Sequence, residues 1–363
     1  MSAFTQEDLT NLNIGQNLDN LMNLDPRGYG VCRILYKASR DYTGKPLSIN
    51  FAEQLIKVVE KDDLVFIIVG FVLLPHKKAE MDGINGAMIL ARAIYRAFGA
   101  KPVIVCPEDN LVAVENMAYD AGLHLYKNVE DVKKYPISMG VITFTKNIKE
   151  AAKQIVDIKS TWGLPAALIA IEAPGANEKG VYHNATGLDM TEYEAKADLM
   201  FKYFAECGVK TFAIGDLGNE MGMGTIKSHI EKYIPYARAN ACRCECKGGI
   251  VADSAADVIL TATVSDWGAY AVTVALAFLL GNDAIAPTPE LIERIMITAS
   301  RSGMVDMYGD LIPSVDGFDK SIVCAIVALM RECIAYAPKL KNTCATWFEK
   351  TLELDFFGEN KIY

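Results

Sequence analysis

Short, continuously apolar runs that alternate with segments of helical period constrain the fold of this chain most. Such runs are typical of strands buried on both faces of a parallel sheet. The clearest are Leu64–Val69, Pro102–Cys106, Gly140–Phe144, Ala166–Ile171 and Thr211–Ile214, with a less clear one near Ile250. The alternation predicts an α/β fold, a three-layer α/β/α sandwich with a mostly parallel sheet and right-handed crossovers.

Helical segments follow the first four of these runs and then dominate the rest of the chain. The predicted crossover helices are Asn85–Phe98, Leu111–Ala121, Ile148–Ile158 and Thr191–Cys207. Four further helices predict a helical C-terminal cap: Gly268–Leu280, Pro289–Ala299, Lys320–Tyr336 and Asn342–Leu354. We therefore divide the chain into an N-terminal wrapping segment (1–50, with a helix at Leu9–Leu24), an α/β core (51–265) and a helical C-terminal part packed on the core (266–363).

Composition narrows the classes of partner. The 45 Asp and Glu against 36 Lys and Arg give a net charge of −9, which repels phosphate backbones, so we expect a small-molecule substrate and no nucleic acid. The N-terminus has no secretory pattern, and the apolar run near Tyr270–Leu280 is shorter than the roughly 20 residues that cross a bilayer, so we expect no membrane association. Nine Cys in a long chain predict free thiols and a cytoplasmic location. A homo-oligomer is compatible with the sequence.

Polar residues follow the first predicted strand. Glu80, Asp82 and Gly83 precede the predicted helix at Asn85, and ligands of parallel sheets bind beyond the carboxyl ends of strands. Backbone N–H groups at this helix start could bind a substrate carboxylate. Alternatively, Asp82 or Asn85 only caps the helix and Gly83 only makes a turn.

A second candidate segment follows the strand at Ala166–Ile171. Glu172 stands at the strand end, and a polar loop with His183 and Asn184 comes next, which suits acid–base chemistry. The alternative is that His183 only makes loop hydrogen bonds and that Asp189 only caps a helix.

The most informative segment is residues 215–224, where four glycines in ten residues permit positive φ and close approach of a ligand. Asp216, Asn219 and Glu220 supply two carboxylates and an amide beside Gly218. The segment lacks the Lys-Ser/Thr ending of a phosphate-binding loop, and its carboxylates would repel a pyrophosphate, so a nucleotide is disfavoured.

Two later segments could be either functional or only structural. Cys242, Cys244 and Cys246 could share one face of a strand, but their spacing is not that of a usual zinc site, so we interpret them as an incidental strand. Asp266 begins a predicted helix beside Trp267 and Tyr270, and could face the pocket, whereas the two aromatic residues are more typical of core packing.

These segments, in this order, resemble the D-glutamate cyclase-like family. The resemblance spans most of the chain, from Asp25-Pro26-Arg27-Gly28 to Ser314-Val315-Asp316-Gly317. Its most specific parts are Glu80-x-Asp82-Gly83-x-x-Gly86, Ile171-Glu172-x-Pro174-Gly175, Tyr182-His183-Asn184, residues 215–224 and Trp267-Gly268-Ala269-Tyr270. The resemblance implies a lyase that cyclises D-glutamate to 5-oxo-D-proline with loss of water.

This reaction needs a base, an acid and a charge stabiliser. We expect the base and acid among Glu172, Asp216 and Glu220, with His183 as the alternative proton carrier. The substrate-binding residues would be Glu80, Asp82, Gly83, Asn184, Gly218, Asn219, Asp266 and Arg27. Asn219 and the glycine-loop N–H groups would stabilise the oxyanion. Arg27 would offset the acidic charge, or Asp216 and Glu220, with Asp82, would hold Mg²⁺ or Mn²⁺.

Two other functions stay open. One is a related lyase or hydrolase acting on another small amino or hydroxy acid. The other is a non-catalytic metabolite-binding or regulatory subunit, since a binding site for an amine would need similar carboxylates.

Overall fold

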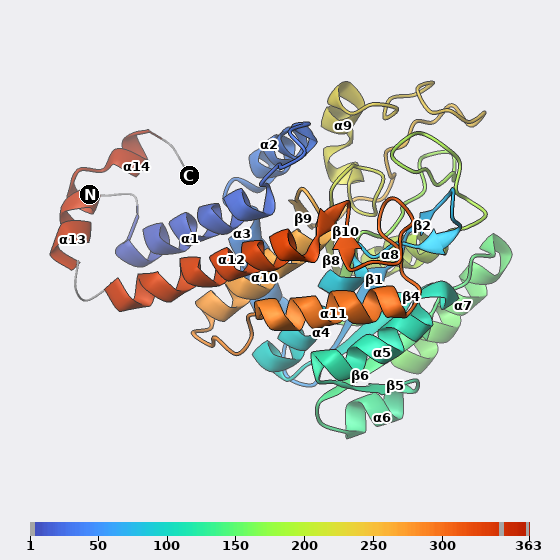
Figure 1. The fold of residues 1–363 in the computed structure, drawn as a ribbon, viewed down its shortest axis with the longest axis horizontal. Coiled ribbons are helices and arrows are strands. Elements are labelled where there is room, and N and C mark those ends of the chain that lie inside the picture. The colour runs from blue at the N-terminus through green and yellow to red at the C-terminus, as the bar shows by residue number, and fades with distance from the viewer. Residues whose placement is uncertain (1–3, 341–344, 361–362) are drawn as a thin grey trace.

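A seven-stranded sheet forms the centre of the molecule (Figure 1). The computed structural model describes residues 4–340, 345–360 and 363. All pairs in the sheet are parallel, in the order β5-β6-β4-β1-β7-β8-β9. The strands are β1 (Leu64–Val69), β4 (Lys101–Cys106), β5 (His124–Tyr126), β6 (Ser138–Thr143), β7 (Ala167–Ile171), β8 (Lys210–Gly215) and β9 (Val258–Thr261). Two small hairpins lie outside the sheet: β2 (Val72–Leu73) with β3 (Lys78–Ala79), and β10 (Ser314–Val315) with β11 (Phe318–Asp319).

Helices cover both faces of the sheet, so that two apolar cores form. The first core takes side chains from α1 (Gln6–Met22), α3 (Leu47–Val58), α4 (Ile84–Phe98), α5 (Leu111–Ala121), α10 (Ser265–Leu279), α11 (Pro289–Arg301) and α12 (Lys320–Leu340). The second takes them from α2 (Val31–Thr43), α6 (Val129–Lys134), α7 (Ile148–Trp162), α8 (Ala197–Glu206) and α9 (Lys227–Tyr233). The three-layer α/β/α sandwich is therefore confirmed.

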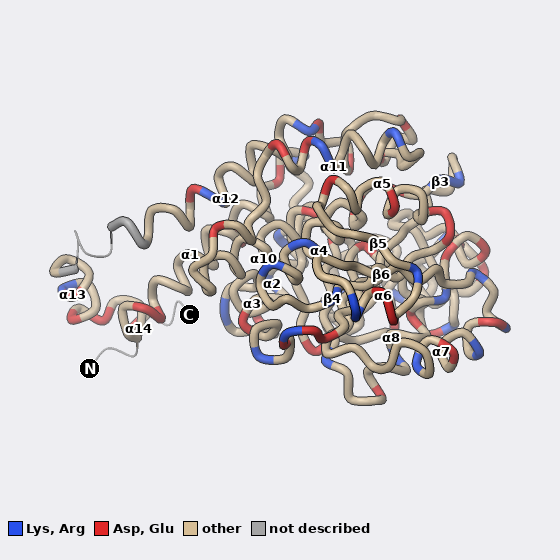
Figure 2. Tube along the Cα trace, turned by 90° about the horizontal axis from the view of Figure 1, so that it is seen from below, with Lys and Arg blue, Asp and Glu red and all other residues tan. Residues whose placement is uncertain are grey.

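The C-terminal helices complete the first helical layer. The buried helix α10 packs on α4 and α3, and α12 packs on α1, α10 and α11. In both overall views α1 and α12 extend together to one side of the sheet, and α13 (Ala345–Glu353) and α14 (Phe356–Glu359) lie at their far end (Figure 1, Figure 2). No helix among the described residues has the length and apolarity needed to cross a bilayer.

Most of the predicted elements are confirmed. All five of the clear strands and the helices at α1, α4, α5, α7, α10, α11 and α12 are present, with ends displaced by a few residues. The predicted helix Asn342–Leu354 corresponds to α13, and residues 342–344 lie outside the described residues. The eight described cysteines are free thiols, as expected.

Three predictions of local structure are wrong. No strand forms at Ile250, because the chain bends at Lys247 and Gly249, which both have positive φ. Ile250 instead lies in a loop, and its side chain is buried. The Cys242–Cys246 segment is likewise a series of turns and bends. The helix predicted from Thr191 begins only at Ala197, because the N–H of Lys196 is bonded to the carbonyl of Thr145.

Four neighbouring strands end at one level. Ile171 pairs with both Val69 and Ile214, and Gly215 pairs with Thr261, so the carboxyl ends of β1, β7, β8 and β9 are aligned. β1 lies inside the sheet with β4 on one side and β7 on the other, so crossovers run in both directions from it. Ligands bind at such a change of direction in open parallel sheets.

Candidate active site

Glu172 is the first residue after β7 and has an unusual backbone conformation. Its φ is 42°, in the left-handed region that non-glycine residues seldom adopt, and such conformations cluster at functional sites. Its carboxylate accepts a hydrogen bond from the Ser265 hydroxyl at 2.6 Å. Burial, and then the negative charges of Glu220, Asp82 and Glu80, raise the pKa of Glu172 well above its usual value. The raised pKa favours the protonated form, so Glu172 is a candidate acid.

The glycine-rich loop after β8 is folded around the carboxylate of Glu220. This buried carboxylate accepts backbone N–H bonds from Asp216 (3.1 Å), Leu217 (2.8 Å) and Gly218 (2.6 Å). Gly218 has a φ of 99°, which a side chain would oppose. The N–H groups that we expected to bind an oxyanion are therefore already bonded within the protein. Glu220 shapes the loop that presents Asp216.

Asp216 is the carboxylate that this loop leaves free. It is 5% exposed, and its Oδ1 has no hydrogen-bond partner among the described residues. Burial, followed by the charges of Glu172, Asp316 and Glu220, raises its pKa well above the usual value. A buried polar atom without a partner costs stability, so this oxygen is available for a ligand.

Asp82 and Asp266 join the N-termini of α4 and α10. Asp82 accepts the N–H groups of Ser265 (3.0 Å) and Asp266 (2.9 Å) at the start of α10. Asp266 in turn accepts those of Gly83 (3.0 Å) and Gly86 (2.6 Å) at the start of α4. Asp82, which precedes α4, thus caps α10, and Asp266, which lies in α10, caps α4. Gly83 is required here, because an added Cβ would lie 2.6 Å from Cβ of Glu172.

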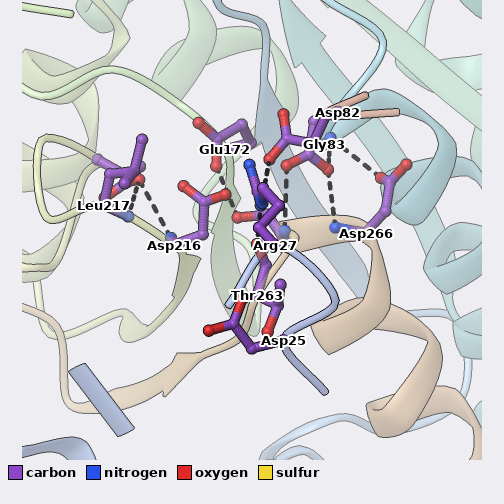
Figure 3. Close-up of polar contacts among 12 residues, drawn as sticks. Asp25, Arg27, Asp82, Gly83, Glu172, Asp216, Leu217, Thr263 and Asp266 are labelled. Carbon is purple, nitrogen blue, oxygen red and sulfur yellow. Dashed lines mark hydrogen bonds and ion pairs between the residues drawn. The ribbon is translucent and has the colours of Figure 1, made fainter. Parts of the chain in front are cut away.

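Arg27 supplies the positive charge of the site. Its guanidinium donates to the carbonyl of Thr263 at 3.0 Å, pairs with Asp316 at 3.4 Å and lies over the ring of Phe318. Figure 3 shows Arg27 among Glu172, Asp216 and Asp82. The turn that contains Arg27 is held by Asp25, whose carboxylate accepts the N–H groups of Gly28 and Gly30.

A cavity of about 80 Å³ opens beside this arginine. It is lined by Asp25, Arg27, Tyr29, Val31, Cys32, Asp216, Leu217 and Thr263. Asp216 and Arg27 thus line the same small space.

Glu80 joins the group of carboxylates through a hydrogen bond with Asp316. Burial and the neighbouring Asp316 carboxylate, to which Glu80 is hydrogen bonded, raise the pKa of Glu80 well above its usual value. Two sets of carboxylates could hold a divalent cation, since their oxygens lie within 4.8 Å of one another: Asp82, Asp216 and Asp316, and Glu172, Asp216 and Glu220. Hard oxygen ligands suit Mg²⁺ or Mn²⁺.

His183 and Asn184 make their contacts elsewhere. Nε2 of His183 lies 3.1 Å from the Cys244 sulfur, and the Asn184 carboxamide accepts N–H bonds from Thr186 and Leu188 of its own loop. Asn219 connects the glycine-rich loop to the loop that contains His183, because its Nδ2 donates to the His183 carbonyl at 2.9 Å. None of the described hydrogen bonds joins the His183 side chain to the carboxylates.

Sequence reasoning did not identify Ser265 or Asp316 as site residues. Ser265 reaches Glu172 only because β7 and the start of α10 are neighbours in space. Asp316 has a φ of 54° and stands before Gly317 in the turn of the β10–β11 hairpin. An aspartate in a tight turn is ordinarily explained by the turn itself, so the sequence carried no separate signal for it.

Comparison with known proteins identifies related chains. The family model described as D-glutamate cyclase-like, C-terminal, matches residues 18–331. A curated relative, the mitochondrial D-glutamate cyclase of Homo sapiens, is 27% identical over 272 residues. The match covers 73% of this chain and 39% of the human protein, so the chain spans about two fifths of the length of that relative.

Proposed function

The chain belongs to the D-glutamate cyclase-like family, and from this membership and the site geometry we propose that it cyclises D-glutamate to 5-oxo-D-proline with loss of water. One observation carries the proposal: Asp216, which has an unpartnered carboxylate oxygen, and Arg27 line the same small cavity. An amino acid substrate needs an anion for its ammonium group and a cation for its α-carboxylate. These two residues supply both.

The substrate is placed with its ammonium group on Asp216 and its α-carboxylate on Arg27. An ammonium group next to a buried carboxylate favours the ionised form, so binding offsets the raised pKa of Asp216 and makes it a base. Cyclisation joins two ends of one short molecule, and holding that molecule bent contributes much of the rate.

The proton balance of the reaction assigns the roles of the two carboxylates. The amine nitrogen loses two protons overall, forms the bond to Cδ, and one γ-carboxyl oxygen departs as water carrying two protons. Asp216 accepts one proton from the amine and passes it to the departing oxygen. Glu172, whose raised pKa favours its protonated form, donates the second proton of the water and then takes the second proton from the nitrogen, so that both carboxyl groups return to their starting states. Ser265 holds Glu172 in place through its hydroxyl.

A Mg²⁺ or Mn²⁺ ion held by Asp216 with Glu172 and Glu220, or with Asp82 and Asp316, would stabilise as a Lewis acid the negative charge that develops on the γ-carboxyl group. The proposed proton transfers use only the side chains of Asp216 and Glu172.

The direct test is to incubate the full chain with D-glutamate and L-glutamate and to follow 5-oxoproline by chiral chromatography. Parallel reactions contain added Mg²⁺ or Mn²⁺. The proposal predicts 5-oxo-D-proline from D-glutamate. Binding of D-glutamate without product under any condition would instead indicate a binding subunit, and product only from another amino or hydroxy acid would indicate a related lyase or hydrolase.

A further inference from the structure

Three cysteines and one histidine form a second cluster outside the carboxylate site. Cys242, Cys244 and Cys246 come from the loop between α9 and β9, and His183 comes from the loop after β7. The four ligand atoms, three Sγ and one imidazole nitrogen, all lie within 4.8 Å of one another. We propose that these four residues bind one structural Zn²⁺ ion.

The distances in the cluster match those between the ligands of a tetrahedral zinc ion. Cys242 Sγ lies 3.7 Å from both Cys244 Sγ and Cys246 Sγ. His183 Nε2 lies 3.1 Å from Cys244 Sγ and 3.4 Å from Cys246 Sγ. Zn–S bonds of about 2.3 Å and Zn–N bonds of about 2.0 Å, at tetrahedral angles, separate two sulfurs by about 3.8 Å and a sulfur from a nitrogen by about 3.5 Å.

Hydrogen-bond donors hold the sulfur of Cys246 in place. The N–H of Gly248 donates to Cys246 Sγ at 3.3 Å, and the Asn177 carboxamide approaches the same sulfur at 3.5 Å. The same carboxamide donates to the carbonyl of Gly249 at 2.7 Å, which fixes the loop behind the sulfur. Donors of this kind orient metal ligands.

The chemistry of the four ligands fits zinc binding. Nε2 of His183 lies beside the sulfurs and can bind a metal through its lone pair. On binding, three S–H bonds are replaced by three Zn–S bonds, and three protons pass to solvent. Four protein ligands fill a tetrahedral site and leave no position for a substrate, so the ion is structural.

The position of the cluster explains what the ion does for the fold. Residues 234–257 form a long connection without a named helix or strand, which is uncommon inside a compact domain. The ion joins this connection to the loop after β7. The carbonyl of His183 accepts from Asn219 in the glycine-rich loop, so the same ion supports the segment that presents Asp216.

The test is the metal content of the untagged full chain, purified with its thiols reduced, loaded with Zn²⁺ and dialysed. Mass spectrometry of the metal should find about one zinc per chain. The double variant Cys244→Ser with Cys246→Ser should lose at least nine tenths of it. Cys207→Ser, which removes a free thiol at the end of α8, is the matched control and should keep it.

A second measurement does not depend on whether the double variant folds. Co²⁺ bound to the wild-type chain should give the intense visible bands of a tetrahedral site and a thiolate-to-cobalt charge-transfer band, and Cys207→Ser should give both. Folded wild-type protein with reduced thiols that holds no zinc and gives no tetrahedral cobalt spectrum would overturn the proposal. Full zinc content in the double variant would do so as well.

Discussion

At the scale of single residues, the site depends on a few backbone positions that only one residue type fits well. Glu172 takes a φ of 42° directly after β7, and Gly83, with a φ of 82°, lies against it. A Cβ at position 83 would lie 2.6 Å from Cβ of Glu172. The carboxylate of Glu172 accepts a hydrogen bond from the Ser265 hydroxyl at the start of α10. Gly83, in the segment that follows β1, therefore leaves the room that the side chain of Glu172 needs.

Replacing Gly83 by alanine tests this contact. The new Cβ would lie 2.6 Å from Cβ of Glu172 and 2.8 Å from the carbonyl oxygen of Ile171, so it must displace the candidate acid. We expect a loss of about 2–4 kcal/mol in the free energy of unfolding, measured with denaturant, together with loss of turnover. Gly122→Ala is the control, because Gly122 has a φ of 72° and nothing within 4 Å of an added Cβ. Equal losses in the two variants would show that the contact with Glu172 has no cost of its own.

The sequence predicted this site only in part. Glu172 and Asp216 could be predicted because each directly follows a continuously apolar strand, and parallel strands bring their carboxyl ends together. The contacts of Ser265 and Asp316 could not, because they depend on which elements are neighbours in space. The placement of His183 beside the thiols likewise depends on two loops far apart in the sequence.

At the scale of elements, α4 and α10 are joined at their N-termini by the exchanged caps Asp82 and Asp266. Each carboxylate accepts backbone N–H groups of the other helix, and the helices pack along their buried faces. Two helix N-termini therefore meet beside the carboxylate site. Their partial positive charges offset some of the negative charge gathered there.

Asp266→Ala should show the strength of this link. The substitution leaves the buried N–H group of Gly86 without its acceptor. It also removes one of two acceptors from the Gly83 N–H, which keeps Asp82, and from the Asn85 carboxamide, which keeps the Met81 carbonyl. We expect a loss of about 2–3 kcal/mol in the free energy of unfolding. Asn147→Ala removes the exposed N-cap of α7 and should cost about 1 kcal/mol or less. A loss for Asp266→Ala no larger than that for Asn147→Ala would contradict the proposed link.

The elements also show where sequence patterns stop being informative. Continuous apolar runs predicted the central strands well, since burial on both faces leaves little choice of residue. The same pattern led to a wrong prediction at Ile250, where the apolar residues that follow two glycines are buried but belong to a loop. The sequence did not predict β5, because three residues are too few to form a recognisable apolar run and none of them is fully buried.

At the scale of the whole molecule, buried carboxylates make stability depend on pH. Burial raises the pKa of Glu194 from 4.5 to about 8. The folded state therefore holds this proton more tightly than the unfolded chain does. The resulting stabilisation is fully present below pH 4.5 and is lost as the pH rises through about 8.

Glu194→Gln should flatten this pH dependence. Glutamine stays neutral and can still accept the Val72 N–H that Glu194 accepts at 3.0 Å. Between about pH 6 and pH 9, we expect the midpoint of thermal unfolding to fall less for the variant than for the wild type, by an amount equivalent to about 1–3 kcal/mol. Glu192→Gln, at an exposed neighbouring position, serves as the control. Parallel pH profiles for Glu194→Gln and the wild type would show that Glu194 does not titrate differently on folding.

Turnover of D-glutamate by Asp216→Asn tests whether Asp216 and Glu172 carry out cyclisation together. We predict a fall in kcat of at least about 100-fold, because the base is lost, with far-ultraviolet circular dichroism unchanged. Asp253→Asn changes an exposed carboxylate that pairs with Lys202, and should keep wild-type kcat. Wild-type turnover by folded Asp216→Asn would contradict the account.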